Sequence, residues 1–159
     1  MGLRKLLNKV PVPIKQAVKD TLYPDMLPEG SEAPDWQLPD QHGKWHSMSG
    51  PNWFLLVFYP GDDTPGCTLQ LAEFQRHLAT FQELGVQVFG VNPAEADSHQ
   101  AFAEKCGYDF PLLVDRGAAV SRQFHSSLPM PYGAKVIRSV YLINPERKIG
   151  LANRGAPSV

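Results

Sequence analysis

The chain has 159 residues, of which 43% are hydrophobic, and a formal net charge of -1. This size and composition suit one domain with a substantial core, and the near-neutral charge argues against broad nucleic-acid binding, which needs a strongly basic face. Two cysteines are too few for a disulfide framework, and no apolar run approaches the roughly 18 residues of a membrane span. We therefore expect a cytoplasmic protein whose cysteines serve catalysis or redox chemistry.

The first 28 residues form a separate predicted segment. Between Met1 and Asp25, lysines and an arginine alternate with leucine, valine and isoleucine, which is typical of an amphipathic helix. We expect one or two short helices, broken at Pro11-Val12-Pro13, that pack on the domain. Attachment to a membrane surface or docking of a partner fits the same pattern. Prolines and a glycine then mark a linker, and the main domain is placed at residues 29–159.

The first half of this domain predicts a hairpin, a strand and a helix. Asp35–Leu38 and Lys44–Met48 read as a short hairpin around Gln41-His42-Gly43. The continuous apolar run Trp53–Tyr59 predicts a buried central strand. Leucine and phenylalanine at helical spacing predict a helix over Cys67–Leu84.

Strands and helices continue to alternate in the second half. The expected strands are Val86–Val91, Pro111–Val114, Arg138–Ile143 and Lys148–Ala152, and the expected helices are Ala96–Lys105 and Ala118–Phe124. Such alternation predicts an α/β fold. The order fits a thioredoxin-like fold, with a central mixed β-sheet flanked by helices and preceded by the N-terminal hairpin and the amphipathic segment.

The loop between the strand Trp53–Tyr59 and the next helix predicts a reactive thiol. Thr64 and Pro65 are typical of a helix N-cap and first helical position, so Cys67 falls in the first turn, where unpaired N–H groups favour a thiolate. A lone cysteine is more often a small buried hydrophobe. The turn-forming residues before Cys67, however, predict a partly accessible, nucleophilic thiol.

Three neighbours are candidates for supporting this thiol. The Thr64 hydroxyl can bond both a thiolate and an oxygen substrate, although capping alone explains its presence. Pro60 would stiffen the loop and shield the sulfur. Arg138, at the start of a strand expected beside Trp53–Tyr59, is the candidate compensating cation, with a surface residue flanking an edge strand as the alternative. Asp62 and Asp63 are expected to be solvated residues that help to shape the loop.

The same residues resemble a known active site. Pro60-x-x-x-Thr64-x-x-Cys67 matches the signature of peroxiredoxins, and the stretch from Phe58 to Thr68 is similar to the PrxQ, or bacterioferritin-comigratory, branch of that family. The similarity runs from about Gly30 to Gly155, and it includes Ser98-His99 and Arg138-Ser139.

The resemblance implies a thiol peroxidase that needs no metal or organic cofactor. In such an enzyme the Cys67 thiolate attacks the terminal oxygen of hydrogen peroxide or an alkyl hydroperoxide, which gives a sulfenic acid and water or an alcohol. By the same resemblance, Thr64 and the Cys67 backbone N–H hold the peroxide, Arg138 polarises it, and Pro60 screens the pocket. Gln70 matches the position whose side chain orients the arginine. The scattered histidines show no zinc-site spacing.

The second half of the reaction is left open. Many members of the branch carry a second cysteine where this chain has Ala72, so that resolving route is absent. Cys106 ends the second predicted helix, and Gly107 is its expected C-cap. Cys106 resembles the resolving site of another subset, although a semi-buried structural thiol fits equally well. If Cys106 is the resolving cysteine, it forms a disulfide with the oxidised Cys67, and thioredoxin reduces that disulfide. Without it, the chain would be a one-Cys peroxidase recycled by an external thiol, or a redox sensor or binding module without turnover. We expect a monomer, with a dimer as the alternative.

Overall fold

The structure is a computed structural model that describes residues 11, 13–14, 23–131 and 133–155. The amphipathic helices expected within residues 1–25 lie almost entirely outside the described residues, and the domain boundary at residue 29 stays a prediction. No helix within the described ranges combines the length and the hydropathy needed to cross a membrane.

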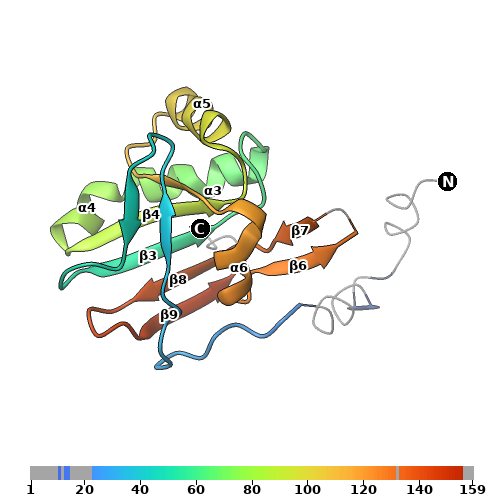
Figure 1. The fold of residues 1–159 in the computed structure, drawn as a ribbon, viewed down its shortest axis with the longest axis horizontal. Coiled ribbons are helices and arrows are strands. Elements are labelled where there is room, and N and C mark those ends of the chain that lie inside the picture. Colours follow the sequence, from blue (N-terminus) through green and yellow to red (C-terminus); the bar gives the residue numbers. More distant parts are fainter. Residues whose placement is uncertain (1–10, 12, 15–22, 132, 156–159) are drawn as a thin grey trace.

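A five-stranded mixed sheet forms the centre of the fold, in the order β5-β4-β3-β8-β9 (Figure 1). The central strand β3 (Trp53–Phe58) pairs in parallel with β4 (Val86–Asn92), which pairs in parallel with β5 (Leu112–Val114). On the other side, β8 (Ser139–Ile143) runs antiparallel to β3, and β9 (Ile149–Arg154) runs antiparallel to β8. The predicted mixed α/β sheet is thereby confirmed.

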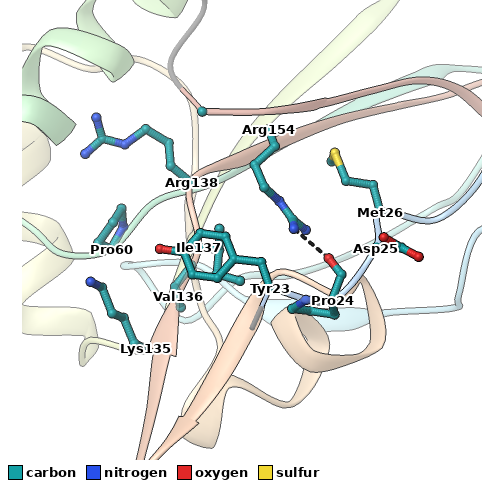
Figure 2. Close-up of a pocket in the computed structure, with 11 residues that line it drawn as sticks. Tyr23, Pro24, Asp25, Met26, Pro60, Lys135, Val136, Ile137, Arg138 and Arg154 are labelled. Atoms are coloured by element: carbon teal, nitrogen blue, oxygen red, sulfur yellow. Dashed lines mark hydrogen bonds between the residues drawn. The ribbon is translucent and has the colours of Figure 1, made fainter. Parts of the chain in front are cut away.

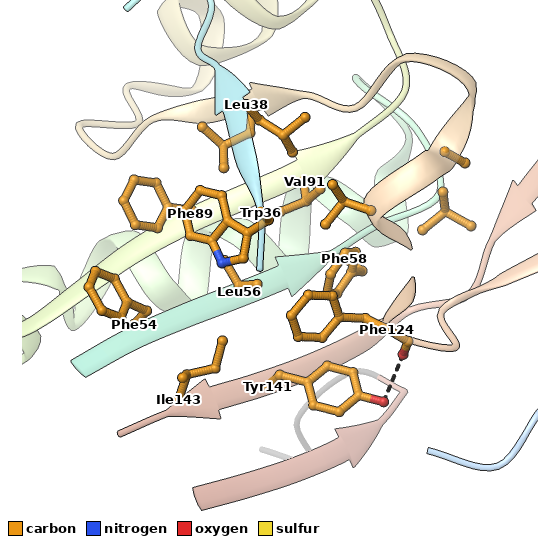
Figure 3. Packing of buried hydrophobic residues seen from close by; sticks show 14 of the residues in the cluster. Trp36, Leu38, Phe54, Leu56, Phe58, Phe89, Val91, Phe124, Tyr141 and Ile143 are labelled. Carbon is orange, nitrogen blue, oxygen red and sulfur yellow. Dashed lines mark hydrogen bonds between the residues drawn. The ribbon is translucent and has the colours of Figure 1, made fainter. Parts of the chain in front are cut away.

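One face of this sheet packs against an N-terminal hairpin and a short helix. The hairpin pairs β1 (Gln37–Pro39) with β2 (Trp45–Ser47), close to the predicted positions. The helix is α6 (Ala119–Gln123), which follows a turn of 3-10 helix at Arg116–Ala118. Figure 3 shows the buried aromatic and aliphatic side chains that fill this layer: Trp36, Leu38, Phe54, Leu56, Phe58, Phe89, Val91, Phe124, Tyr141 and Ile143.

The opposite face packs against α3 (Pro65–Arg76) and α5 (Ala96–Cys106) (Figure 1). Because successive side chains of a strand point to opposite faces, β3 contributes Leu55 and Val57 to this second layer, and Tyr59 follows directly after the strand. A strand covered on both faces is expected to be continuously apolar, which explains the run that identified β3 in the sequence. Cys67 belongs to this second layer.

Two segments differ from the expected elements. The predicted helix Cys67–Leu84 is divided at His77 into α3 and α4 (Leu78–Glu83), and no glycine or proline marks that position. A second hairpin, formed by β6 (Ser127–Met130) and β7 (Gly133–Val136), gave no strand signal. Its prolines lack the N–H that a ladder needs, and they are tolerated here because the hairpin is a separate two-stranded ribbon.

Candidate active site

Cys67 lies at the third residue of α3, close after the carboxyl end of β3. The helix begins at Pro65, and the preceding Thr64 has extended backbone angles (φ -90°, ψ 146°). This is the predicted N-cap arrangement. The N–H groups of the first turn have no partner within the helix, so they favour negative charge on the Cys67 sulfur.

The Thr64 side chain does not cap the helix. It makes no capping hydrogen bond, and its exposed hydroxyl instead donates to the Gly61 carbonyl at 3.4 Å. The hydroxyl therefore closes the loop that precedes α3. Its predicted contact with a peroxide stays a prediction.

Arg138 is brought to Cys67 by the pairing of β3 with β8. Because these strands are antiparallel, Ser139 at the start of β8 lies opposite Phe58 at the end of β3. The preceding residue, Arg138, donates from Nη2 to the Cys67 Sγ at 3.4 Å. Gly66 makes room for this contact, because a Cβ at that position would lie 3.0 Å from the same Nη2 atom.

Cys67 is fully buried, with 0% of its surface exposed, so the expected partial accessibility is wrong. The sulfur lies within the apolar layer that includes Tyr59 and Leu71, and Arg138 lies close over the backbone of the first turn at Gly66. Pro60 is exposed and lines a cavity together with Arg138 (Figure 2). A shielding role of Pro60 stays a prediction.

Gln70 does not make the contact that was expected of it. Its side chain is 2% exposed, and both amide heteroatoms are buried without a hydrogen-bond partner. Gln70 lies one turn beyond Cys67, whereas Arg138 approaches the beginning of that turn at Gly66. The predicted orientation of Arg138 by Gln70 is thus not observed.

A buried carboxylate anchors the loop between β3 and α3. Asp62 Oδ2 lies 2.7 Å from His99 Nδ1 and accepts a hydrogen bond of 2.7 Å from Ser98 Oγ. Asp62 Oδ1 accepts a hydrogen bond of 2.6 Å from the Tyr59 hydroxyl. The Asp62 side chain is 6% exposed, so the expectation that it is solvated is wrong: three protein donors replace water around it.

The ring of His99 lies between hydrogen-bond acceptors. Nε2 lies 2.9 Å from the Leu113 carbonyl oxygen and 3.2 Å from that of Asn92. Carbonyl oxygens only accept, so Nε2 is a donor, and Nδ1 faces the Asp62 carboxylate on the other side of the ring. A proton between Nδ1 and the carboxylate joins the two side chains as a buried pair.

This environment keeps Asp62 ionised and Tyr59 protonated. Burial acts to raise the pKa of Asp62, but the hydrogen bonds from His99, Tyr59 and Ser98 and the charge of His99 outweigh it and hold that pKa below its ordinary value. Burial, together with the neighbouring Asp62 charge, raises the pKa of Tyr59 well above its ordinary value. This network has no local sequence pattern, because Asp62 lies in the loop before α3 and His99 lies in α5.

The adjacent carboxylate, Asp63, is exposed and forms a second link to α5. Lys105 Nζ lies 2.9 and 3.1 Å from its two oxygens, and both side chains are more than half exposed. Such surface pairs contribute little to stability. Asp63 is therefore the solvated loop residue that the sequence predicted, and Asp62 is the anchor.

Cys106 is the last residue of α5 and is half-buried. Gly107 follows in the left-handed conformation (φ 72°, ψ 37°) as the predicted helix C-cap. The Tyr108 hydroxyl donates to the Thr68 carbonyl in α3 at 3.0 Å. Burial raises the pKa of Tyr108 well above its ordinary value. Because Tyr108 follows the end of α5 closely, its hydrogen bond to Thr68 links that end to the first turn of α3.

Both cysteines are free thiols. Among the residues that the structure describes, no group of three or more histidine, cysteine, aspartate or glutamate side chains lies close enough together to bind a metal ion. The chemistry that this arrangement supports is therefore that of the Cys67 sulfur and the Arg138 guanidinium.

We expect Asp62→Asn to lower the free energy of unfolding by about 2–4 kcal/mol at neutral pH, because it leaves His99 without its carboxylate. The pKa of Asp62 is lower in the folded than in the unfolded chain, so its contribution is complete above the unfolded value of about 3.9 and is lost as the pH falls through the folded value. Urea unfolding of both proteins should show the difference shrinking below about pH 4.

Asp63→Asn is the matched control, since it removes the neighbouring carboxylate and breaks only the exposed pair with Lys105. We expect no measurable change in unfolding over the same pH range. Equal destabilisation by the two variants would contradict the assignment of the buried pair as the anchor.

Comparison with known proteins identifies the family. The model of the AhpC/TSA family matches residues 30–152. A protein of Helicobacter pylori (strain J99) named putative peroxiredoxin bcp is 33% identical over 128 residues, which cover 77% of this chain and 84% of that protein. The chloroplastic peroxiredoxin Q of Triticum aestivum is 35% identical over 116 residues, which cover 72% of this chain and 54% of that protein.

Solved structures show the same fold. The crystal structure of peroxidoxin BcpB from Mycobacterium tuberculosis aligns with a TM-score of 0.75 at 28% identity, covering 79% of this chain and 84% of that one. A cysteine mutant of PrxQ from Xylella fastidiosa aligns with a TM-score of 0.76 at 28% identity, covering 84% and 91%. The predicted thioredoxin-like fold is thereby confirmed.

The chain spans 54% to 66% of the length of the first plant relatives that it matches. The family assignment does not depend on those relatives, because the AhpC/TSA model matches most of the chain and the alignment with the Helicobacter protein covers most of both sequences. The chain therefore belongs to the AhpC/TSA family, and within it to the branch of peroxiredoxin Q and Bcp.

Proposed function

We propose that this chain is a thiol-dependent peroxidase that reduces hydrogen peroxide and alkyl hydroperoxides at Cys67. The observation that carries the proposal is the contact of 3.4 Å between Arg138 Nη2 and the Cys67 sulfur in the first turn of α3. A helix N-terminus and a guanidinium both favour the thiolate, which is the nucleophilic form of cysteine. Membership of the AhpC/TSA family supports the same chemistry.

In the proposed reaction, the Cys67 thiolate donates an electron pair to the terminal oxygen of the hydroperoxide while the O–O bond breaks. The terminal oxygen stays on sulfur as a sulfenic acid, and the leaving oxygen takes up a proton to become water or an alcohol. Arg138 stabilises the negative charge that moves onto the leaving oxygen. The Thr64 hydroxyl and the Cys67 backbone N–H hold the peroxide in line with the sulfur, and Pro60 screens the pocket.

For recycling, we propose that the Cys106 thiolate attacks the sulfur of the Cys67 sulfenic acid and forms a disulfide that thioredoxin reduces. The S–O bond breaks, and the hydroxide that leaves takes up a proton to become water. A disulfide needs Cα atoms within about 7 Å, and we propose that the first turn of α3 unwinds to bring Cys67 to Cys106. That movement breaks the hydrogen bond of the Tyr108 hydroxyl to the Thr68 carbonyl. Before oxidation this hydrogen bond keeps the first turn of α3 folded, and we call it the Tyr108 latch.

The alternative is a one-Cys peroxidase whose sulfenic acid is reduced by an external thiol, such as glutaredoxin or glutathione. A redox sensor or binding module on the same fold would be oxidised without turnover. We further propose that the protein is cytoplasmic, since a reducing compartment suits two free cysteines. We also propose that it is a monomer.

Turnover with single-cysteine variants tests the proposal. We expect Cys67→Ser to abolish peroxide consumption in the presence of a thiol donor, because it removes the sulfur that Arg138 contacts. Cys106→Ser should keep a single round of peroxide reduction and lose thioredoxin-dependent turnover. Full activity of Cys67→Ser would overturn the assignment, and full thioredoxin-dependent turnover of Cys106→Ser would favour the one-Cys alternative.

The latch is tested by the rate of disulfide formation after one equivalent of hydrogen peroxide. We expect non-reducing peptide mapping to find a Cys67–Cys106 link, and Tyr108→Phe to speed its formation about fivefold, the effect of one hydrogen bond of about 1 kcal/mol. Tyr141→Phe is the matched control, since it removes a hydroxyl whose hydrogen bonds, to the Phe124 carbonyl and from the Leu27 N–H, lie outside α3 and α5. An unchanged rate in Tyr108→Phe would rule out the latch, and a product without the link would remove the resolving role of Cys106.

A further inference from the structure

A cavity of about 700 Å³ opens beside the catalytic arginine (Figure 2). Arg138 belongs both to its wall and to the contact with the Cys67 sulfur, and Pro60 lines the cavity from the end of β3. Hydrogen peroxide has roughly the volume of two water molecules, about 60 Å³. The cavity is therefore far larger than the smallest substrate needs, and its size is that of a site for an organic ligand.

The wall opposite Pro60 comes from the N-terminal segment Tyr23–Met26. In Figure 2, the Tyr23 ring projects from this segment toward the side of the cavity that carries Pro60 and Ile137. The segment lies outside residues 30–152, which match the family model. This wall is thus an addition to the part of the chain that carries the family's pattern.

Side chains of the domain fix the segment in this position. The Arg154 guanidinium donates to the carbonyl oxygens of Pro24 and His125, and it lies 5.9 Å from the centre of the Tyr23 ring, within the range of a cation–π contact. The Asp25 carbonyl lies 2.8 Å from a ring nitrogen of His125. Farther along, the Leu27 N–H donates to the Tyr141 hydroxyl at 3.0 Å.

The charges of the cavity are already engaged or lie at its rim. Arg138 contacts the sulfur, Arg154 contacts the two carbonyl oxygens, and Asp25 and Lys135 are exposed. The surfaces that remain for a ligand include the Tyr23 ring and the side chains of Met26, Pro60 and Ile137. These are apolar or aromatic surfaces, which suit an uncharged organic group.

We propose that Tyr23 determines the selectivity of the peroxidase for organic hydroperoxides, because its ring binds their aryl or alkyl group in this cavity. The inference rests on the proposed function, in which the Thr64 hydroxyl and the Cys67 N–H hold the peroxide beside the sulfur and Arg138 faces the leaving oxygen. From that position the organic group extends past Arg138 toward the N-terminal wall. Hydrogen peroxide has no such group and gains nothing from Tyr23.

The test compares cumene hydroperoxide with hydrogen peroxide in the full chain. We expect Tyr23→Ala to lower kcat/KM for cumene hydroperoxide about tenfold, the loss that removal of an aromatic contact surface causes. The constant for hydrogen peroxide should stay within about a factor of two. Tyr23→Phe keeps the ring and should behave like the wild type with both substrates.

Trp45→Ala is the matched control, since Trp45 is an exposed aromatic residue on β2 that does not line this cavity. It should change neither constant. An equal effect of Tyr23→Ala on both substrates, or no effect on either, would overturn the inference while the wild type still reduces hydrogen peroxide. Failure of the wild type to reduce either peroxide would instead contradict the proposed function.

Discussion

The structure of this site depends on the contact between the Arg138 guanidinium and the Cys67 sulfur. Arg138 directly precedes β8, and Cys67 lies in α3, the helix that follows the neighbouring strand β3. β3 delivers the chain into the loop and then into α3, where Cys67 lies in the first turn. β8 runs antiparallel to β3, so its beginning lies at the same end of the sheet, and Arg138 reaches the sulfur. Gly66 leaves room for the approach, because a Cβ there would lie 3.0 Å from Nη2 and displace the guanidinium by a few tenths of an ångström. The positive charge of Arg138 thus lies beside the buried Cys67 thiol for three reasons: the pairing of β3 with β8, the N-terminus of α3, and the absence of a side chain at Gly66.

A second charge pair holds the loop that carries this geometry. Asp62 and His99 are almost completely removed from water, and each has its hydrogen-bonding capacity satisfied by the protein. A buried ion pair is weak evidence for net stability, because desolvation offsets the attraction, but breaking it leaves an unpaired charge. We therefore infer that the pair holds the loop between β3 and α3 in one conformation. That conformation fixes the start of α3, and with it the position of Cys67 relative to Arg138.

The sequence was sufficient for the features that depend on local patterns. The apolar run of β3, the Thr64-Pro65 start of α3 and the Gly107 end of α5 each have a local physical cause, and each was predicted. The approach of Arg138 to Cys67 followed from strand order. The predictions that were wrong concern contacts between distant segments. Asp62 was expected to be solvated, because nothing near it in the sequence indicates that His99 packs beside it. Cys67 was expected to be accessible, because the apolar layer that buries it comes from several elements. The β6–β7 hairpin, which directly precedes Ile137 and Arg138, was not predicted, because its prolines are unfavourable in strands.

The most direct measurement is the second-order rate constant for oxidation of Cys67 by hydrogen peroxide, with Arg138 and with Arg138→Gln. Both chains should carry Cys106→Ser, so that the sulfenic acid does not react further within the molecule, and circular dichroism should verify that both are folded. If the guanidinium stabilises the charges of the reaction, the substitution lowers the constant by about 10²–10³. A constant that stays within about a factor of two would contradict the central role of the contact between Arg138 and Cys67.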